Sequence, residues 1–194
     1  MADNAPAVQL VVGLGNPGPK YEQTRHNAGF WFVDELDRRF FCGLKPETRF
    51  HGEAGRCNID GRDCRVLKPL TYMNKSGQAV AALAGFFRIP AERILVVHDE
   101  LDLPVGTVKL KRGGGHGGHN GLRDIIAHLG KDFLRLRVGI DHPGHKDQVI
   151  DYVLQKASRD DRISIDRALD AALEVMPLLV RGELEKAMHR LHSQ

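Results

Sequence analysis

Cysteine is scarce in this chain, with three residues among 194. They are Cys42, Cys57 and Cys64, and no two of them stand in a C-x-x-C spacing. This spacing disfavours a zinc knuckle and a thioredoxin-type redox site. An odd number of cysteines without a secretion signal fits a reducing compartment, so we expect a cytoplasmic protein.

Long apolar runs are also missing. No stretch approaches the roughly 18 consecutive apolar residues of a membrane span. The start, Met1–Pro6, lacks the basic segment and apolar core of a secretory signal, so we expect no membrane partner. The net charge of +3, from 28 Lys and Arg against 25 Asp and Glu, permits a polyanionic partner without requiring one.

The length predicts one domain over residues 1–194, with residues 1–7 as a flexible lead. Runs of apolar and β-branched residues predict strands, and apolar residues three and four apart predict helices between them. The strands are expected near 8–12, 94–97, 105–110 and 134–140, and the helices near 30–40, 79–87, 122–129 and from 146 to the end, with a bend at Pro177. This alternation predicts an α/β fold, a mixed twisted β-sheet flanked by α-helices.

One hairpin is predicted in detail. Asp60 and Gly61 are a strong signal for a two-residue turn between strands. The resulting register places Cys57 opposite Cys64. Proximity alone does not make a disulfide, and we interpret both cysteines as packing residues.

The first glycine cluster, Gly13–Gly18, matches G-x-G-x-x-G directly after a strand. A dinucleotide site would need a helix to open at Gly18 and a second strand ending in an acidic residue. Pro17 and Pro19 flank that glycine, and no such strand follows. We therefore favour the alternative, a tight turn that places Asn16 at a cleft, and expect no cofactor.

Two segments contain candidates for proton transfer. His26 lies in a polar loop before the first helix, and an ordinary histidine can accept a proton near neutral pH. A lone histidine is more often structural, so its neighbours matter. Asp99 belongs to an acidic segment, His98–Asp102, after a buried strand. Its carboxylate could be solvated, bind a cation or orient a histidine; without an H-E-x-x-H motif or a second ligand cluster, we expect no metal.

The second glycine cluster, Gly113–Gly121, lies between a predicted strand and helix. Its side chains are His116, His119 and Asn120, so the backbone can approach a ligand closely. Asn120 could cap the following helix or direct its amide at a bound group. Basic residues stand on both sides, at Lys109, Lys111, Arg112, Arg123, Arg135 and Arg137. Such residues are usually solvated, but their convergence on one loop fits a phosphate-bearing ligand.

Six motifs follow one another between Gln9 and His192. They are Val12–Gly18, Tyr21 with Thr24–Gly29, Lys68–Gly77, His98–Pro104, Gly113–Gly121, and Arg137 with His142–Gly144. With these motifs in this order, the chain resembles the family of bacterial peptidyl-tRNA hydrolases. The resemblance implies a monomeric enzyme of the carboxylic-ester hydrolase class that cleaves the ester between tRNA and a peptide or N-blocked aminoacyl group. It also implies recycling of peptidyl-tRNA released from ribosomes, with no metal, no cofactor and no obligate protein partner.

The resemblance assigns roles residue by residue. His26 matches the general base that activates water, Asp99 the carboxylate that orients it, and Asn16 the asparagine that distinguishes N-blocked from free aminoacyl-tRNA. Predicted contacts with the nascent peptide, the 3′ end or the acceptor stem are Tyr21, Tyr72, Met73, Asn74, Lys109, Lys111, His119, Asn120, Arg137 and Lys146. The alternative function is a non-catalytic RNA-binding module, in which His26 would have no catalytic role.

Overall fold

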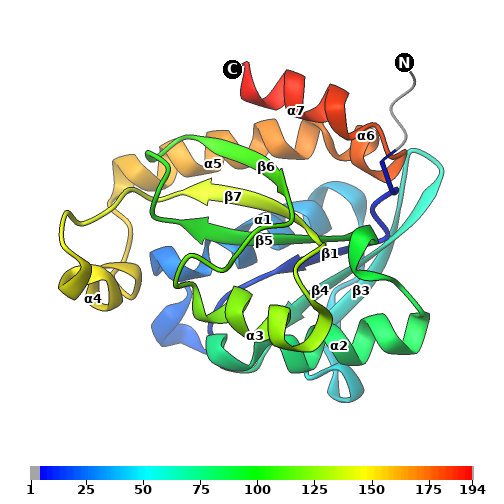
Figure 1. The fold of residues 1–194 in the computed structure, drawn as a ribbon, viewed down its shortest axis with the longest axis horizontal. Coiled ribbons are helices and arrows are strands. Elements are labelled where there is room, and N and C mark those ends of the chain that lie inside the picture. Colours follow the sequence, from blue (N-terminus) through cyan, green and yellow to red (C-terminus); the bar gives the residue numbers. More distant parts are fainter. Residues whose placement is uncertain (1–4, 194) are drawn as a thin grey trace.

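A seven-stranded sheet forms the centre of the computed structural model, which describes residues 5–193 (Figure 1). Its order is β2-β3-β4-β1-β5-β7-β6. The strands are β1 (Leu10–Gly13), β2 (Lys45–Glu47), β3 (Gly52–Ile59), β4 (Arg62–Pro69), β5 (Ile94–Glu100), β6 (Val108–Arg112) and β7 (Leu134–Gly139). Strands β4, β1, β5 and β7 pair in parallel, while β2, β3 and β6 join in antiparallel pairs. The mixed sheet of the predicted α/β fold is thus confirmed.

Helices cover both faces of the sheet. They are α1 (Ala28–Phe40), α2 (Ser76–Phe87), α3 (Asn120–Leu129), α4 (Val149–Val153), α5 (Arg159–Glu174), α6 (Met176–Val180) and α7 (Leu184–His192). One core packs α1, α5, α6 and α7 against one face, and a second core packs α2 and α3 against the other. In Figure 1, α5 to α7 lie above the central strands and α2 and α3 below them.

The two cores follow from the alternation of side chains along each strand. In β1, Val11 enters the first core, whereas Leu10 and Val12 enter the second. In β5, Leu95 and Val97 face the first core and Val96 faces the second. Because successive side chains point to opposite faces, a strand covered on both sides must be apolar throughout.

The predicted hairpin has the predicted register. Cys57 lies opposite Cys64 across β3 and β4, and both thiols are buried and free. Asp60 and Gly61 have φ angles of 53° and 79°, as a type I′ turn requires. The cysteines therefore act as packing residues in the first core.

Strand β5 is longer than the sequence indicates. The apolar run ends at Val97, but the strand continues through His98 and Asp99 to Glu100. His98 and Asp99 are almost fully buried. Polar residues at buried strand positions need polar partners, and those partners come from distant parts of the chain.

The predicted lead over residues 1–7 lies partly outside the described residues, since the structure describes the chain from Ala5. The carbonyl of Ala7 accepts a hydrogen bond from Arg93, and the Val8 amide donates to Leu179. Among the described residues, every helix is too short or too polar to cross a membrane.

The first turn of α1 packs unusually tightly against the ends of β1 and β5. A Cβ at Gly29 would lie 2.3 Å from the Val97 carbonyl oxygen and 2.4 Å from the Leu14 nitrogen. Only glycine permits this approach, which holds the loop bearing His26 over the sheet.

We therefore expect Gly29→Ala to destabilise the fold by about 2 kcal/mol or more, because the backbone atoms around it cannot move aside cheaply. Gly85→Ala is the matched control, since Gly85 lies in α2 with no atom near its missing Cβ. That change should stabilise the protein by about 0.5–1 kcal/mol. Urea unfolding measures both, and equal midpoints for the two variants would contradict the account.

Candidate active site

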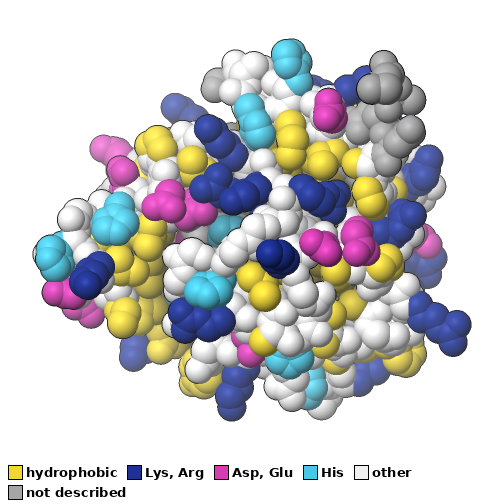
Figure 2. Space-filling view, viewed as in Figure 1, with side chains coloured by type: hydrophobic (Ala, Val, Ile, Leu, Met, Phe, Trp, Pro, Cys, Tyr) yellow, Lys and Arg dark blue, Asp and Glu magenta, His cyan; other side chains and the backbone are white. Residues whose placement is uncertain are grey.

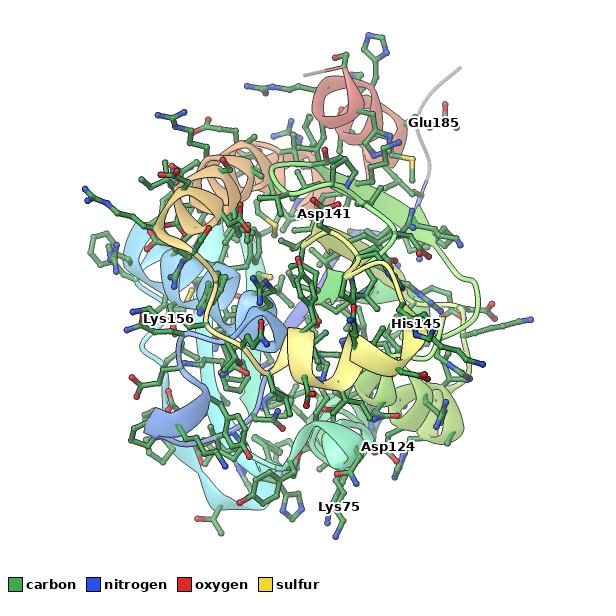
Figure 3. The ribbon with its side chains drawn as sticks, turned by 90° about the vertical axis from the view of Figure 1, so that its left-hand side faces the viewer. Lys75, Asp124, Asp141, His145, Lys156 and Glu185 are labelled. Carbon is green, nitrogen blue, oxygen red and sulfur yellow. The ribbon has the colours of Figure 1, made fainter. Side chains whose placement is uncertain are left out.

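A cleft of about 600 Å³ opens at the carboxyl ends of the parallel strands. Its floor includes Asn16, His26 and Asp99, and one wall is α4. In Figure 3, which faces this side of the molecule, α4 crosses the view between His145 and Lys156. Ligand sites in open α/β sheets usually lie at this edge, because loops from neighbouring strands converge there.

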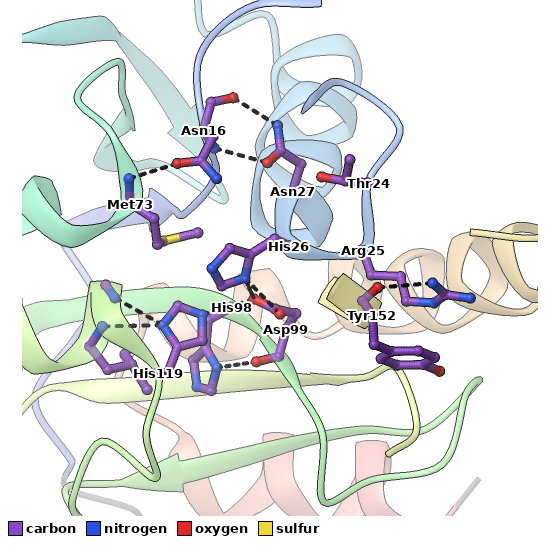
Figure 4. A network of polar contacts seen from close by, with 12 residues as sticks. Asn16, Thr24, Arg25, His26, Asn27, Met73, His98, Asp99, His119 and Tyr152 are labelled. Carbon is purple, nitrogen blue, oxygen red and sulfur yellow. Dashed lines mark hydrogen bonds and ion pairs between the residues drawn. The ribbon is translucent and has the colours of Figure 1, made fainter. Parts of the chain in front are cut away.

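His26 and Asp99 are in direct contact within the cleft. The Nδ1 atom of His26 lies 2.9 Å from one carboxylate oxygen of Asp99 and 3.1 Å from the other. A carboxylate accepts hydrogen bonds, so Nδ1 carries the proton and donates it. Figure 4 shows this contact between the two side chains. The neutral His26 ring then has its lone pair on Nε2.

The loop that holds His26 is fixed by the contacts of the preceding residue, Arg25. The Arg25 amide donates a hydrogen bond to the Gln155 carbonyl. The Arg25 guanidinium donates to the Tyr152 carbonyl at 3.0 Å, and it also lies over the Tyr152 ring, 4.0 Å from the ring centre. These contacts tie the His26 loop to the end of α4 and to the residues that follow it.

His119 is the second imidazole on Asp99. Its Nε2 lies 2.8 Å from Asp99, while its Nδ1 accepts hydrogen bonds from the Gly121 and Leu122 amides. An acceptor nitrogen carries no proton, so Nε2 holds it and donates to Asp99. His119, rather than Asn120, therefore caps α3, which corrects one of the two roles considered for Asn120. The cap leaves the exposed Asn120 side chain at the cleft.

The paired charges set the protonation states. Burial lowers the pKa of His26, but the charge and hydrogen bond of Asp99 outweigh it, so the pKa is raised above 6.5. Burial tends to raise the pKa of Asp99, yet the two imidazoles hold it well below its usual range. Asp99 is therefore a permanent carboxylate near neutral pH.

His98 has a different character. Its Nδ1 donates to the Asp99 carbonyl at 2.8 Å, and its Nε2 is buried without a partner among the described residues. Burial, with a contribution from His119, lowers the pKa of His98 to about 4. It is a neutral ring that packs edge-on against His119, with ring centres 5.2 Å apart.

Asn16 is held by two partners. Its backbone exchanges hydrogen bonds with the Asn27 side chain at 2.8 and 3.0 Å, and its Oδ1 accepts from the Met73 amide at 2.7 Å. The amide NH₂ of Asn16 makes no hydrogen bond to any described residue, and Asn16 lines the cleft. Figure 4 shows it beside His26. The glycine cluster Gly13–Gly18 forms a strand-to-loop turn, and it is followed by a single 3₁₀ turn, Pro19–Tyr21, rather than by an α-helix.

The structure divides the remaining predicted residues into two groups. Tyr72, Met73, Asn74, His119, Asn120 and Lys146 line the cleft. Of the described residues that line it, none is Tyr21, Lys109, Lys111 or Arg137. Tyr21 lies in a short helix after the first turn, under the Lys20 ammonium.

The three basic residues lie beside the cleft on the last two strands. Lys109 pairs across the sheet with Arg137, and Lys111 with Arg135, so all four side chains emerge on one face. Arg137 donates to Glu100 at 2.9 Å, and Glu100 lines the cleft. The buried Arg135 instead donates to the Gly114 and Gly115 carbonyls and holds the glycine loop in place.

Sequence reasoning missed the apolar wall of the cleft. Val149, Ile150, Val153 and Leu154 all line it. Ile150 is 72% exposed, which is unusual for isoleucine. A sequence signal was present, because Val149 with Val153 and Ile150 with Leu154 form two apolar pairs four residues apart, as on one face of a helix. In sequence, however, such a short apolar helix cannot be told from an ordinary core segment.

One group could hold a metal ion on proximity alone. The nearest atoms of His26, Asp99 and His119 all lie within 4.8 Å of one another. Each imidazole, however, already contacts Asp99 at hydrogen-bond distance, and the Nδ1 of His119 is engaged by the α3 cap. The donor geometry favours the hydrogen-bonded arrangement.

Comparison with known proteins shows the family to which the chain belongs. The family model described as Peptidyl-tRNA hydrolase matches residues 10–194. The chain belongs to this family of hydrolases. It is 58% identical to the peptidyl-tRNA hydrolase of Halorhodospira halophila, with both chains covered completely, and 56% identical to that of Psychrobacter arcticus, with 96% and 97% covered.

A solved member has the same fold. The crystal structure of the peptidyl-tRNA hydrolase from Acinetobacter baumannii superposes with a TM-score of 0.94 at 51% identity, covering 98% of this chain and 97% of that one. The two proteins therefore share one fold over almost their whole lengths.

Proposed function

We propose that this protein hydrolyses the ester that joins a peptide, or an N-blocked aminoacyl group, to the terminal ribose of tRNA. The observation that supports this most directly is the His26–Asp99 pair, which leaves a basic imidazole nitrogen in a cleft lined by amide side chains. Membership in the peptidyl-tRNA hydrolase family supports the substrate class.

His26 is the general base. Asp99 holds the Nδ1 proton, so Nε2 can accept a proton from a water molecule as that water attacks the ester carbonyl. The charge of Asp99 also stabilises the imidazolium that forms, as the raised pKa of His26 indicates. A positioned base contributes roughly 10²–10⁴-fold to the rate.

Amide side chains stabilise the negative charge that develops on the carbonyl oxygen. Asn16 has a fixed orientation and an unused NH₂ group, while Asn74 and Asn120 are exposed at the rim of the same cleft. A donor of this kind contributes on the order of 10²–10³-fold. These neutral donors also avoid the desolvation cost of a buried charge.

The apolar wall suits the peptide. Met73 lies on one side of the cleft, and Ile150 and Leu154 on the other. Side chains of many kinds can pack on such a surface, whereas the polar donors lie near the reacting ester. Selection for N-blocked over free aminoacyl groups is assigned to Asn16.

Basic residues beside the cleft suit the tRNA. Lys146 lies at the cleft, and Lys109, Lys111 and Arg137 follow on β6 and β7. Their contacts with acceptor-stem phosphates would add salt-dependent affinity without base recognition.

We further propose that the protein acts as a monomer in the cytoplasm, without a metal, and recycles peptidyl-tRNA released from ribosomes. The aromatic ring of Tyr72, 62% exposed at the cleft, and that of Tyr21 are assigned to the 3′ end of the tRNA.

Replacing His26 should abolish turnover while preserving the fold. We expect His26→Ala to lower kcat about 10²–10⁴-fold on N-acetyl-aminoacyl-tRNA, assayed with EDTA present. His128→Ala is the matched control, because His128 is exposed on α3, does not line the cleft, and has Asp124 as its hydrogen-bond partner. The same tRNA with a free α-amine should be cleaved slowly by the wild type.

A folded His26→Ala variant with an undiminished rate would show that another group is the base. Loss of the wild-type rate in EDTA would contradict the metal-free mechanism. If the wild type binds tRNA but releases nothing from the blocked substrate, the alternative of an RNA-binding module replaces the proposal.

The pH profile tests the role of Asp99. His26 acts as a base only when neutral, so the rate falls as the pH drops through its pKa, which lies above 6.5 in the wild type. Asp99→Asn removes the charge that raises this pKa, so the acid limb of kcat/KM should move to lower pH. The plateau of kcat should fall about 10²-fold or more, with a smaller change in binding. An unmoved acid limb, with only a lowered melting temperature, would make Asp99 a scaffold residue.

A further inference from the structure

A second hollow lies beside the edge strand β6. It has a volume of about 360 Å³ and is bounded by the start of β6, the middle of α5 and the end of α7. Its lining residues are Val105, Gly106, Thr107, Val108, Lys109, Ser164, Arg167, Ala168, Ala171, Leu191 and His192. None of the functions described above uses this hollow except through Lys109.

The charge of the hollow has one sign. Lys109 and Arg167 line it, and the described lining contains no Asp or Glu. Within the part of the chain that the structure covers, neither residue forms an ion pair, so no neighbouring carboxylate neutralises either charge. Two unpaired cations in one concave site attract an anion, because low-dielectric walls strengthen the field between them.

Hydroxyl groups and small residues complete the surface. Thr107 lines it just before β6, and Ser164 lines it from α5 together with the small residues Ala168 and Ala171. Gly106 has a φ of 88°, and a Cβ there would come no closer than 3.6 Å to its nearest neighbour, the Cβ of Ser164. Hydroxyl donors beside Lys and Arg are typical contacts of phosphate oxygens.

His192 gives the hollow a fixed edge. Its Nε2 accepts a hydrogen bond from the Leu110 amide at 3.0 Å, which satisfies an outward-facing donor of the edge strand β6. Burial and the nearby charge of Lys109 lower the pKa of His192, so the ring stays a neutral acceptor. The end of α7 is thereby tied to β6 beside Lys109.

The hollow continues the basic residues beside the cleft. Arg137 contacts Glu100 at the cleft and pairs with Lys109 across the sheet, and Lys109 on the edge strand β6 also lines the hollow, as Arg167 does from α5. Figure 2 shows Lys and Arg side chains gathered over the part of this face where Figure 1 draws β6 and β7. A chain of phosphates that leaves the cleft along Arg137 would next meet Lys109 and then Arg167.

We propose that this hollow is a phosphate-binding site for the RNA backbone, with Arg167 as its principal cation. The inference rests on the proposed function, since it extends the path of the bound tRNA from the acceptor stem to the layer formed by α5 and α7. Arg167 supplies a planar donor group that can contact two phosphate oxygens at once.

Binding of deacylated tRNA tests the site without requiring hydrolysis. The dissociation constant is measured between about 50 and 200 mM KCl for the wild type, Arg167→Gln and Arg167→Lys. We expect Arg167→Gln to bind about five- to tenfold more weakly at 0.1 M salt, with the slope of log Kd against log salt reduced by about one. Arg167→Lys should recover much of the affinity, because it keeps the charge.

Arg38→Gln is the matched control. It removes the same charge from an exposed arginine on α1 that lines none of the cavities described here, and it should bind tRNA as the wild type does. Melting temperatures verify that all variants are folded. Wild-type affinity and salt slope for Arg167→Gln would overturn the proposal. Undiminished tRNA affinity together with weaker binding of poly-glutamate would also overturn it, in favour of an acidic peptide.

The two proposals fail separately. If the wild type hydrolyses peptidyl-tRNA but Arg167→Gln binds tRNA normally, the hollow is not an RNA site and the enzymatic proposal stands. If the wild type releases no peptide but Arg167→Gln loses affinity, the hollow is an RNA site and the enzymatic proposal fails.

Discussion

The carboxylate of Asp99 is the interaction on which this site depends. It lies at the end of a buried strand, where an unpaired charge would be very costly. Two imidazoles, those of His26 and His119, offset that cost by donating direct hydrogen bonds at 2.9 and 2.8 Å. In return, the carboxylate determines which nitrogen of each ring carries a proton. One charge thereby joins the first loop, the fifth strand and the glycine-rich loop into a single arrangement.

The rest of the fold serves to hold that charge in place. Parallel pairing of β1 with β5 brings the loop after β1 beside the end of β5. The close approach of Gly29 to Val97 and Leu14 fixes the start of α1 above both strands. The α3 cap made by His119 ties the glycine loop to the same carboxylate. The approach of Gly29 requires a residue without a side chain, and the α3 cap requires a side chain that accepts hydrogen bonds.

Much of this could be predicted from the sequence, because local patterns reflect local physics. The Asp60-Gly61 turn determined the register of β3 and β4, and helical spacing identified α1, α2 and α3. The extension of β5 through Asp99 could not be predicted, since His98 and Asp99 are buried only because distant residues provide partners. The exposed apolar face of α4 was missed for a related reason. Its significance depends on the cleft that it faces, and no local pattern encodes that cleft.

The most direct test of the account is the protonation of His26 itself, followed by ¹⁵N and ¹H NMR of its ring across pH. The account predicts that the neutral ring carries its proton on Nδ1 and that its pKa lies above 6.5. A neutral ring protonated on Nε2 would contradict it, because the free nitrogen would then face Asp99 instead of a water molecule in the cleft. A pKa at or below the ordinary value would also contradict it, because Asp99 would then not stabilise the imidazolium.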